Sequence, residues 1–126
     1  MGKAVIVTRI LAGALLLVVG LDKFFGFYPL PAGTAEANAF VEALNATGYM
    51  MPLVAAVETL SGLCFLSGRF VPLAAVVVAP VSLNAFLFHL FLSPMAMIPT
   101  TTLFILNLLL LIQERQSYRQ LFKTKS

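Results

Sequence analysis

Five polar or ionisable side chains lie within or at the ends of long apolar runs, and together they have the chemistry of a functional site. They are Asp22, Lys23, Glu58, Asn84 and His89. A charged side chain in a membrane-spanning segment costs about 2.5–3.5 kcal/mol on insertion scales, so each of these residues needs a partner or a function. Such groups can form an ion pair, transfer a proton or hold a polar ligand. We expect all five toward the outer half of one helical bundle.

Glu58 is the most informative of these residues, because it lies inside an apolar run that starts at Pro52 and ends near Ser67. It is about six residues, or roughly 9 Å of helix, from the start of that run. A carboxylate at that depth needs a cationic neighbour, and Lys23 at the end of the first apolar run has a stem long enough to reach it. Two interpretations stay open. Glu58 is either a proton or ligand site, or one half of a structural ion pair between the first two spans.

His89 and Asn84 belong to the third apolar run and allow several interpretations. His89 could hydrogen-bond a quinone, relay a proton or bind a metal, and an interfacial bond to a loop carbonyl is the structural alternative. A metal needs several ligands, and the sequence has no second histidine and no close carboxylate spacing, so we predict no metal site. Asn84 is about 140° around an ideal helix from His89, so the two share a face only if Pro80 alters the winding.

Two further polar residues are expected to be structural. Asn107 lies near the middle of the fourth apolar run and should face the bundle, where an amide can bond to a neighbouring helix. Arg9 lies near the inner boundary of the first run, where its long side chain can extend toward the headgroups. Cys64 is the single cysteine, which excludes an internal disulfide and a CxxC redox pair.

The composition identifies the environment that must position these residues. The chain has 126 residues, of which 60% are hydrophobic and 10% charged, and its mean hydropathy is +0.99. A soluble domain carries roughly 25% charged residues, so this composition excludes an ordinary soluble globule and a disordered tail. The length allows a single domain. We therefore predict an all-α integral membrane protein that is embedded in the lipid bilayer.

The order of apolar and polar segments predicts a four-helix transmembrane bundle. Between the first two spans lies a segment in which Ala37, Phe40, Val41 and Leu44 follow a helical spacing, with Thr34 as its N-cap. This segment is too polar to span, and we expect it to be a short amphipathic helix across the extracytoplasmic face. The predicted spans are 4–22, 52–67, 70–92 and 96–112, the amphipathic helix is 34–47, and a basic tail follows at 113–126.

The positive charges predict the orientation. A formal net charge of +3 could suggest a nucleic-acid partner. The excess positive charge lies at the ends of apolar runs, however, so we expect it to set the orientation of the protein in the membrane and predict no nucleic-acid partner. Four spans place both termini on one side, which should be the cytoplasmic side of the plasma membrane. Of the eight Lys and Arg residues, Lys23 is on the opposite side and seven are on the side of the termini: Lys3, Arg9, Arg69, Arg115, Arg119, Lys123 and Lys125.

Several of these segments resemble the DoxX family of small four-helix membrane proteins. The first run ends in Gly20-Leu-Asp-Lys23, similar to the motif that ends the first helix of that family. The resemblance continues through the following segments and covers about residues 9–114. These segments are Ala46-Thr-Gly-Tyr49, Val57-Glu58 with Ser61-Gly62, Gly68-Arg-Phe70, and the stretch from Pro80 through Asn84 to His89.

The resemblance implies a subunit or accessory of a membrane redox complex, since family members are tied to thiosulfate:quinone oxidoreductase and to thiol-stress complexes. It marks Lys23, Glu58, Asn84 and His89 as the family-type polar positions. This chain has no complete catalytic constellation, so electron transfer would need a redox partner subunit or a bound quinone. Our first hypothesis is a small lipophilic ligand such as a quinone in the outer half of the bundle. The alternatives are a non-catalytic scaffold or assembly factor and a small proton-coupled transporter; a homo-oligomer is compatible with each.

Overall fold

The computed structural model describes residues 2–25, 34–92 and 97–121, and these residues are entirely helical or irregular, with no strand among them. The all-α class is therefore confirmed. Lys123 and Lys125, part of the predicted basic tail, lie outside the described residues. The elements in chain order are α1 (Lys3–Phe25), α2 (Ala35–Ala46), α3 (Met50–Ser67), α4 (Val71–Phe91), α5 (Met97–Gln113) and a short 3-10 helix, η2 (Arg115–Tyr118).

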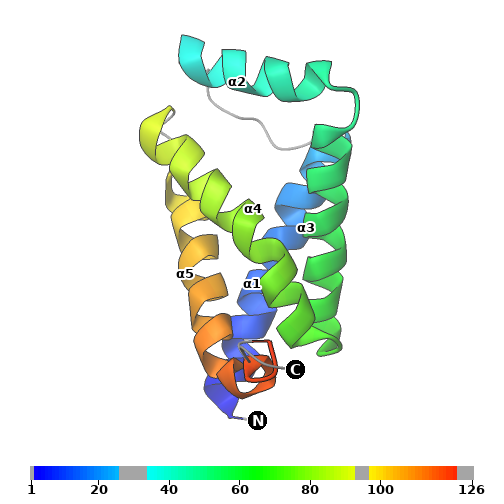
Figure 1. The fold of residues 1–126 in the computed structure, drawn as a ribbon, viewed down its shortest axis with the longest axis vertical. Helices are drawn as coiled ribbons and strands as arrows, with labels where there is room; N and C mark the ends of the chain where they lie inside the picture. Colours follow the sequence, from blue (N-terminus) through cyan, green and yellow to red (C-terminus); the bar gives the residue numbers. More distant parts are fainter. Residues whose placement is uncertain (1, 26–33, 93–96, 122–126) are drawn as a thin grey trace.

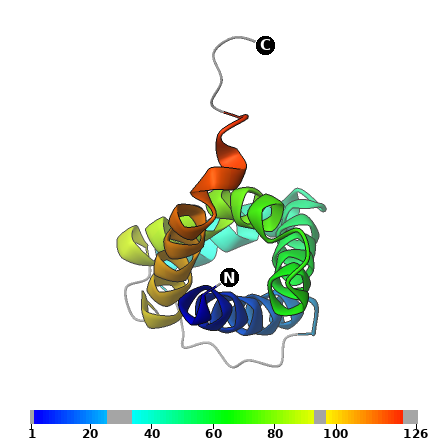
Figure 2. The same ribbon diagram turned by 90° about the horizontal axis from the view of Figure 1, so that it is seen from below.

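The four long helices lie side by side in a ring, in the order α1, α3, α4, α5 (Figure 2). Each of them packs against the two helices beside it in that ring. The start of α1, the turn between α3 and α4, and η2 lie at one end, which we name the η2 end (Figure 1). Helix α2 lies across the opposite end, which we name the α2 end.

Helix α2 is held across its end of the ring by a cap and an aromatic contact. The Thr34 hydroxyl accepts a hydrogen bond from the Ala37 backbone N–H at 3.1 Å, as predicted for an N-cap, and itself donates to the Leu92 carbonyl at the end of α4. The ring of Phe40 lies 5.3 Å from that of Phe88 on α4. The polar side of α2 is exposed and Ala37 is buried, as an amphipathic helix requires.

Three helices are long and apolar enough to cross a membrane: α1 over Lys3–Phe24, α3 over Met50–Ser67 and α4 over Val71–Phe91. Helix α5 is equally apolar in character but has 17 residues, about the shortest length that spans a hydrocarbon core. Large apolar side chains are exposed along the outer sides of the helices, which suits a lipid environment and not water. Examples are Leu11, Leu60, Leu73 and Ile105.

A buried polar cluster joins α4 and α5 among the apolar side chains of the ring interior. Helix α4 carries Pro80, which cannot donate a backbone hydrogen bond within the helix. Close to it, the Asn107 amide of α5 donates to the Ala75 carbonyl at 3.1 Å and accepts from the Ser82 hydroxyl at 2.8 Å. Asn107 is buried and faces the other helices, where it joins α5 to α4 beside the proline.

Candidate functional site

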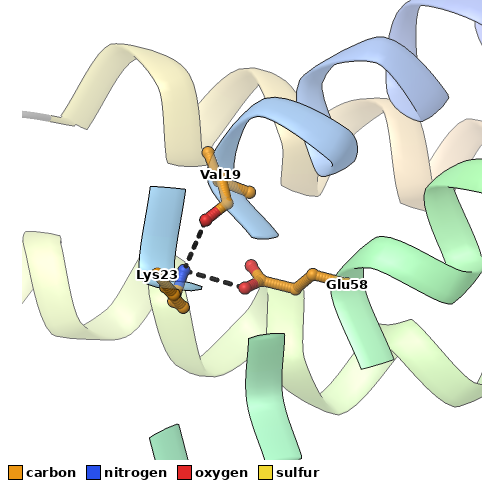
Figure 3. A network of polar contacts seen from close by, with 3 residues as sticks. All are labelled: Val19, Lys23 and Glu58. Carbon is orange, nitrogen blue, oxygen red and sulfur yellow. Dashed lines mark hydrogen bonds and ion pairs between the residues drawn. The ribbon is translucent and has the colours of Figure 1, made fainter. Parts of the chain in front are cut away.

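The structure brings Lys23 and Glu58 together near the α2 end. The Lys23 Nζ lies 2.8 Å from Glu58 Oε1 and also donates to the Val19 carbonyl at 3.5 Å (Figure 3). The Glu58 side chain is only 3% exposed, whereas that of Lys23 is 26% exposed. The acid is thus enclosed by protein, and the amine reaches it from the rim.

Helix geometry explains why these two side chains meet. Lys23 is in the last turn of α1, where the negative end of the helix dipole favours a cation. Glu58 is on the buried face of α3, and Gly20, one turn before Lys23, lets the two helices approach there. A Cβ at Gly20 would lie 2.6 Å from Thr59 Oγ1 and 3.2 Å from the Ala55 carbonyl oxygen. The missing side chain at position 20 therefore makes the close approach beside the ion pair possible.

The same two helices are also in close contact farther from the pair. A Cβ at Gly62 would lie 2.9 Å from the Gly13 carbonyl oxygen, and a Cβ at Gly13 would lie 2.9 Å from the Gly62 carbonyl oxygen. Backbone therefore packs on backbone, as at small-residue interfaces in membrane proteins. The depth and orientation of Glu58 relative to α1 are set by this interface.

The other three candidate residues have different surroundings. Asp22 is half-buried and directly precedes Lys23 in α1. His89 is half-buried in the last turn of α4, where its ring is edge-on to that of Phe88 with the ring centres 5.0 Å apart. Asn84 is exposed on α4. Of the five predicted site residues, the structure thus joins two in an ion pair and places His89 next to the aromatic contact beneath α2.

Arg9 contacts the opposite end of the ring. Its guanidinium packs against the turn between α3 and α4, where a Cβ at Gly68 would lie 2.6 Å from Arg9 Nη1. Gly68 has φ +78, the left-handed conformation that favours glycine at a helix C-terminus. The positive charge of Arg9 is therefore next to the C-terminal end of α3, which stabilises a cation.

Three polar residues that take part in specific contacts were not among the predicted ones. Thr59 packs on Gly20 beside the ion pair, and Ser82 bonds to Asn107 in the interior. The Tyr118 hydroxyl donates to the Pro72 carbonyl at 2.8 Å, which ties η2 to the start of α4. Burial and the nearby Glu114 carboxylate raise the pKa of Tyr118 above its ordinary value of 10.0. Only Ser82 had a sequence signal, its position two residues after an intrahelical proline.

Within the described ranges, no group of three or more His, Cys, Asp and Glu residues is close enough to hold a metal ion. Cys64 is a half-buried free thiol in α3. The polar groups at the α2 end include the Lys23–Glu58 ion pair and the His89 imidazole, which lies next to aromatic rings.

Comparison with known proteins gives the family. The sequence model of the DoxX family matches residues 4–90, more than half of the chain. The chain belongs to the DoxX family. The DoxX match contains Lys23, Glu58, Asn84 and His89, whereas Asn107 and its helix α5 follow the matched range.

A curated relative supports this membership. The chain is 37% identical over 86 residues to inner membrane protein YqjF of Escherichia coli, an alignment that covers 68% of this chain. The aligned part spans 61% of the length of that relative, less than two thirds. No solved structure matches the chain. The DoxX resemblance inferred from the sequence is thus confirmed, and the chain is an integral membrane protein of that family.

Proposed function

We propose that this protein crosses the plasma membrane four times with both termini in the cytoplasm. Helix α5 then supplies the fourth crossing, since its 17 residues are about the minimum for a span. The elements at the η2 end carry Lys3, Arg69, Arg115 and Arg119, so the excess of positive charge supports a cytoplasmic location for this end. Helix α2, with its two glutamates, lies outside. The similar protein of Escherichia coli is described as an inner membrane protein.

We further propose that the α2 end binds a small lipophilic ligand such as a quinone, and that the protein serves as a subunit of a membrane redox complex. The observation that carries this proposal is the partly exposed Lys23 paired with the enclosed Glu58. An ammonium group has three hydrogens, and the contacts to Glu58 and Val19 use two of them. The third can donate to a ligand carbonyl.

The aromatic side chains at the α2 end suit an aromatic, carbonyl-bearing ligand. His89, Phe88 and Phe40 lie at the same end of the ring, beneath and on α2. Quinone rings stack on such side chains, and a quinone tail can remain among the lipid chains outside the helices. In this proposal Lys23 donates a hydrogen bond to the ligand, Glu58 holds the Lys23 side chain in place, and His89 contacts the ligand ring.

A second candidate, a non-catalytic scaffold, is favoured by a specific observation. The ion pair is next to the close contact of Gly20 with Thr59, so it also fixes α1 against α3. In this case the pair stabilises the fold and no ligand meets it. The two candidates differ in whether Lys23 affects ligand binding beyond its effect on stability.

Thermal unfolding of the purified protein in mild detergent, with and without a short-chain ubiquinone, tests the proposal. We expect saturating quinone to raise the Tm by several degrees, about what ligand at 100 times its Kd gives a small protein. The variant Lys23→Met should lose this shift. The control Asn107→Leu should lower the Tm without removing the shift, because Asn107 is in the interior, remote in the chain from the pair.

Each outcome has a clear meaning. No quinone shift in the wild type, or an undiminished shift in Lys23→Met, contradicts ligand binding at the pair. The scaffold function is supported if the shift is absent and the protein co-purifies in mild detergent with a stoichiometric membrane partner. Orientation is tested separately, by reaction of an Asn45→Cys variant (with Cys64 replaced by Ala) with a membrane-impermeant maleimide from outside the cell.

A further inference from the structure

Two apolar grooves flank α4, and the candidate site uses neither of them. One groove lies between α3 and α4 and has a volume of about 620 Å³. The other lies between α4, α5 and η2 and has a volume of about 540 Å³. Neither is lined by Lys23, Glu58 or His89. Each has an arginine in its lining, Arg69 in the first and Arg115 in the second, which gives each groove an apolar body and a cationic end.

The α3–α4 groove has walls from both helices of that pair. Leu60 and Leu63 line it from α3, and Leu73 and Val77 line it from α4. All four side chains are exposed. Because both helices are predicted to cross the membrane, the groove runs along them from the η2 end toward the membrane interior. An extended hydrocarbon chain has the shape and polarity of this groove.

Arg69 lies at the end of the groove in the turn between α3 and α4, and its side chain is exposed. The backbone N–H of Arg69 is bonded to the Cys64 carbonyl at 3.2 Å. Its guanidinium has no hydrogen bond or ion pair with any residue in the described part of the chain. In the other groove, Arg115 Nη1 donates to the Ile112 carbonyl at 3.1 Å. The guanidinium of Arg69 is therefore the more available of the two for an anion.

Phe70, next to Arg69, is a second unusual feature of the same groove. It has φ 57 and ψ 29, the left-handed region, and its side chain is 70% exposed. A residue with a side chain pays about 1–2 kcal/mol for this conformation. The turn nonetheless holds an exposed aromatic ring and an exposed guanidinium side by side at the mouth of an apolar groove. Such a combination suits the headgroup boundary of a membrane.

We propose that the α3–α4 groove binds an anionic phospholipid, with its phosphate at Arg69 and an acyl chain along α3 and α4. Arginine binds phosphate through two parallel hydrogen bonds, and Arg9 against Gly68 adds positive charge at the same turn. Basic pockets between transmembrane helices on the cytoplasmic side are suited to anionic headgroups. The proposal requires only that the η2 end lies at a membrane surface, and it does not depend on quinone binding at the α2 end.

Native mass spectrometry of the purified protein tests the proposal, with equimolar phosphatidylglycerol and phosphatidylcholine of identical acyl chains as the competing probes. We expect the wild type to retain phosphatidylglycerol preferentially. The variant Arg69→Gln should bind phosphatidylglycerol about ten-fold more weakly, the effect of losing one charge-assisted contact. Its matched control is Arg119→Gln, which makes the same change of charge near the same end but does not line either groove. This control should keep wild-type binding.

A second variant tests the groove independently of the charge. Val77→Trp places a large side chain in the groove at an exposed position, so it should block lipid binding while leaving the Tm of the protein within a few degrees of wild type. Equal retention of the two lipids by the wild type overturns the proposal. Equal losses of phosphatidylglycerol binding in Arg69→Gln and Arg119→Gln would also overturn it, because they would show a non-specific attraction to positive charge. Unchanged phosphatidylglycerol binding in Val77→Trp would overturn it as well.

Discussion

The ion pair between Lys23 and Glu58 predicts a strong energetic coupling between these two residues. With 2.8 Å between Nζ and Oε1, Coulomb's law gives about 6 kcal/mol of attraction at an effective dielectric constant of about 20. The loss of hydration on burying the carboxylate offsets much of this attraction, and water at the partly exposed lysine screens part of the rest. We expect a net coupling of about 2 kcal/mol between the two side chains.

A double-mutant cycle measures this coupling directly. Lys23→Met leaves an enclosed carboxylate without its amine and should cost about 3 kcal/mol, at the low end of the range for broken buried pairs. Glu58→Gln leaves a partly exposed lysine and should cost about 2 kcal/mol. The double variant should cost about 3 kcal/mol, because the second substitution removes the group that the first left unpaired. The assay is the free energy of unfolding in bicelles, measured by steric trapping.

The cycle has a matched control within the same helix. Lys3 is at the start of α1, at the η2 end, so a cycle of Lys3→Met with Glu58→Gln should show a coupling close to zero. Mutations at distant sites deviate from additivity by up to about 0.5 kcal/mol. If the coupling energy from the Lys23 cycle is smaller than this, the electrostatic reasoning is refuted. The same conclusion follows if the two cycles give equal couplings.

Three further predictions concern other contacts of the structure. Gly62→Ala should destabilise the protein by about 1–3 kcal/mol, because the new Cβ would lie 2.9 Å from the Gly13 carbonyl oxygen; thermal unfolding in detergent measures this. Asn107→Leu should cost about 1–2 kcal/mol and Ser82→Ala less, since the amide makes two buried hydrogen bonds and the hydroxyl shares one of them. Raising the pH above 10.0 should destabilise the wild type but not Tyr118→Phe, because the folded protein holds the Tyr118 proton more tightly than the unfolded chain does.

These predictions have controls and contrary outcomes of their own. A Cβ at Gly2 would meet open space, so Gly2→Ala should leave the Tm unchanged. An equally unchanged Tm in Gly62→Ala would contradict the close approach of α1 and α3. An Asn107→Leu variant as stable as the wild type would mean that the interior amide contributes nothing net. The stability that the protonated Tyr118 contributes is fully present below pH 10.0 and is lost as the pH rises above it. Equal alkaline sensitivity of the wild type and Tyr118→Phe would therefore contradict the contact with the Pro72 carbonyl.

The sequence alone predicted the features that depend on a local residue pattern or on the high free-energy cost of burying an unpaired charge. A carboxylate inside an apolar run must be paired, and Lys23 was the cation at a similar depth, so the contact with Glu58 followed from the cost of buried charge. Thr34 as a helix cap and Asn107 as an inward-facing amide followed from the same local arguments. The overall helical class followed from composition and apolar run lengths.

The features that the sequence did not predict depend on how helices rotate and where the chain turns. Whether Asn84 faces a neighbour or the outside depends on the rotation of α4 about its own axis, which the packing of its Ala and Val side chains determines. The bond from Tyr118 to the Pro72 carbonyl joins residues 46 positions apart, and no local pattern indicates it. Phe70 takes a left-handed conformation usual for glycine, so propensity argues against the observed turn.

Photo-cross-linking with an azidoquinone, followed by mapping of the labelled peptides, tests the central claim most directly. We expect labelling of the peptide that contains Lys23 and of the α3 peptide around Glu58, with loss of both in the presence of excess unmodified quinone. Labelling confined to the α3–α4 groove near Arg69, or spread evenly over the exposed helix faces, would contradict a ligand site at the α2 end.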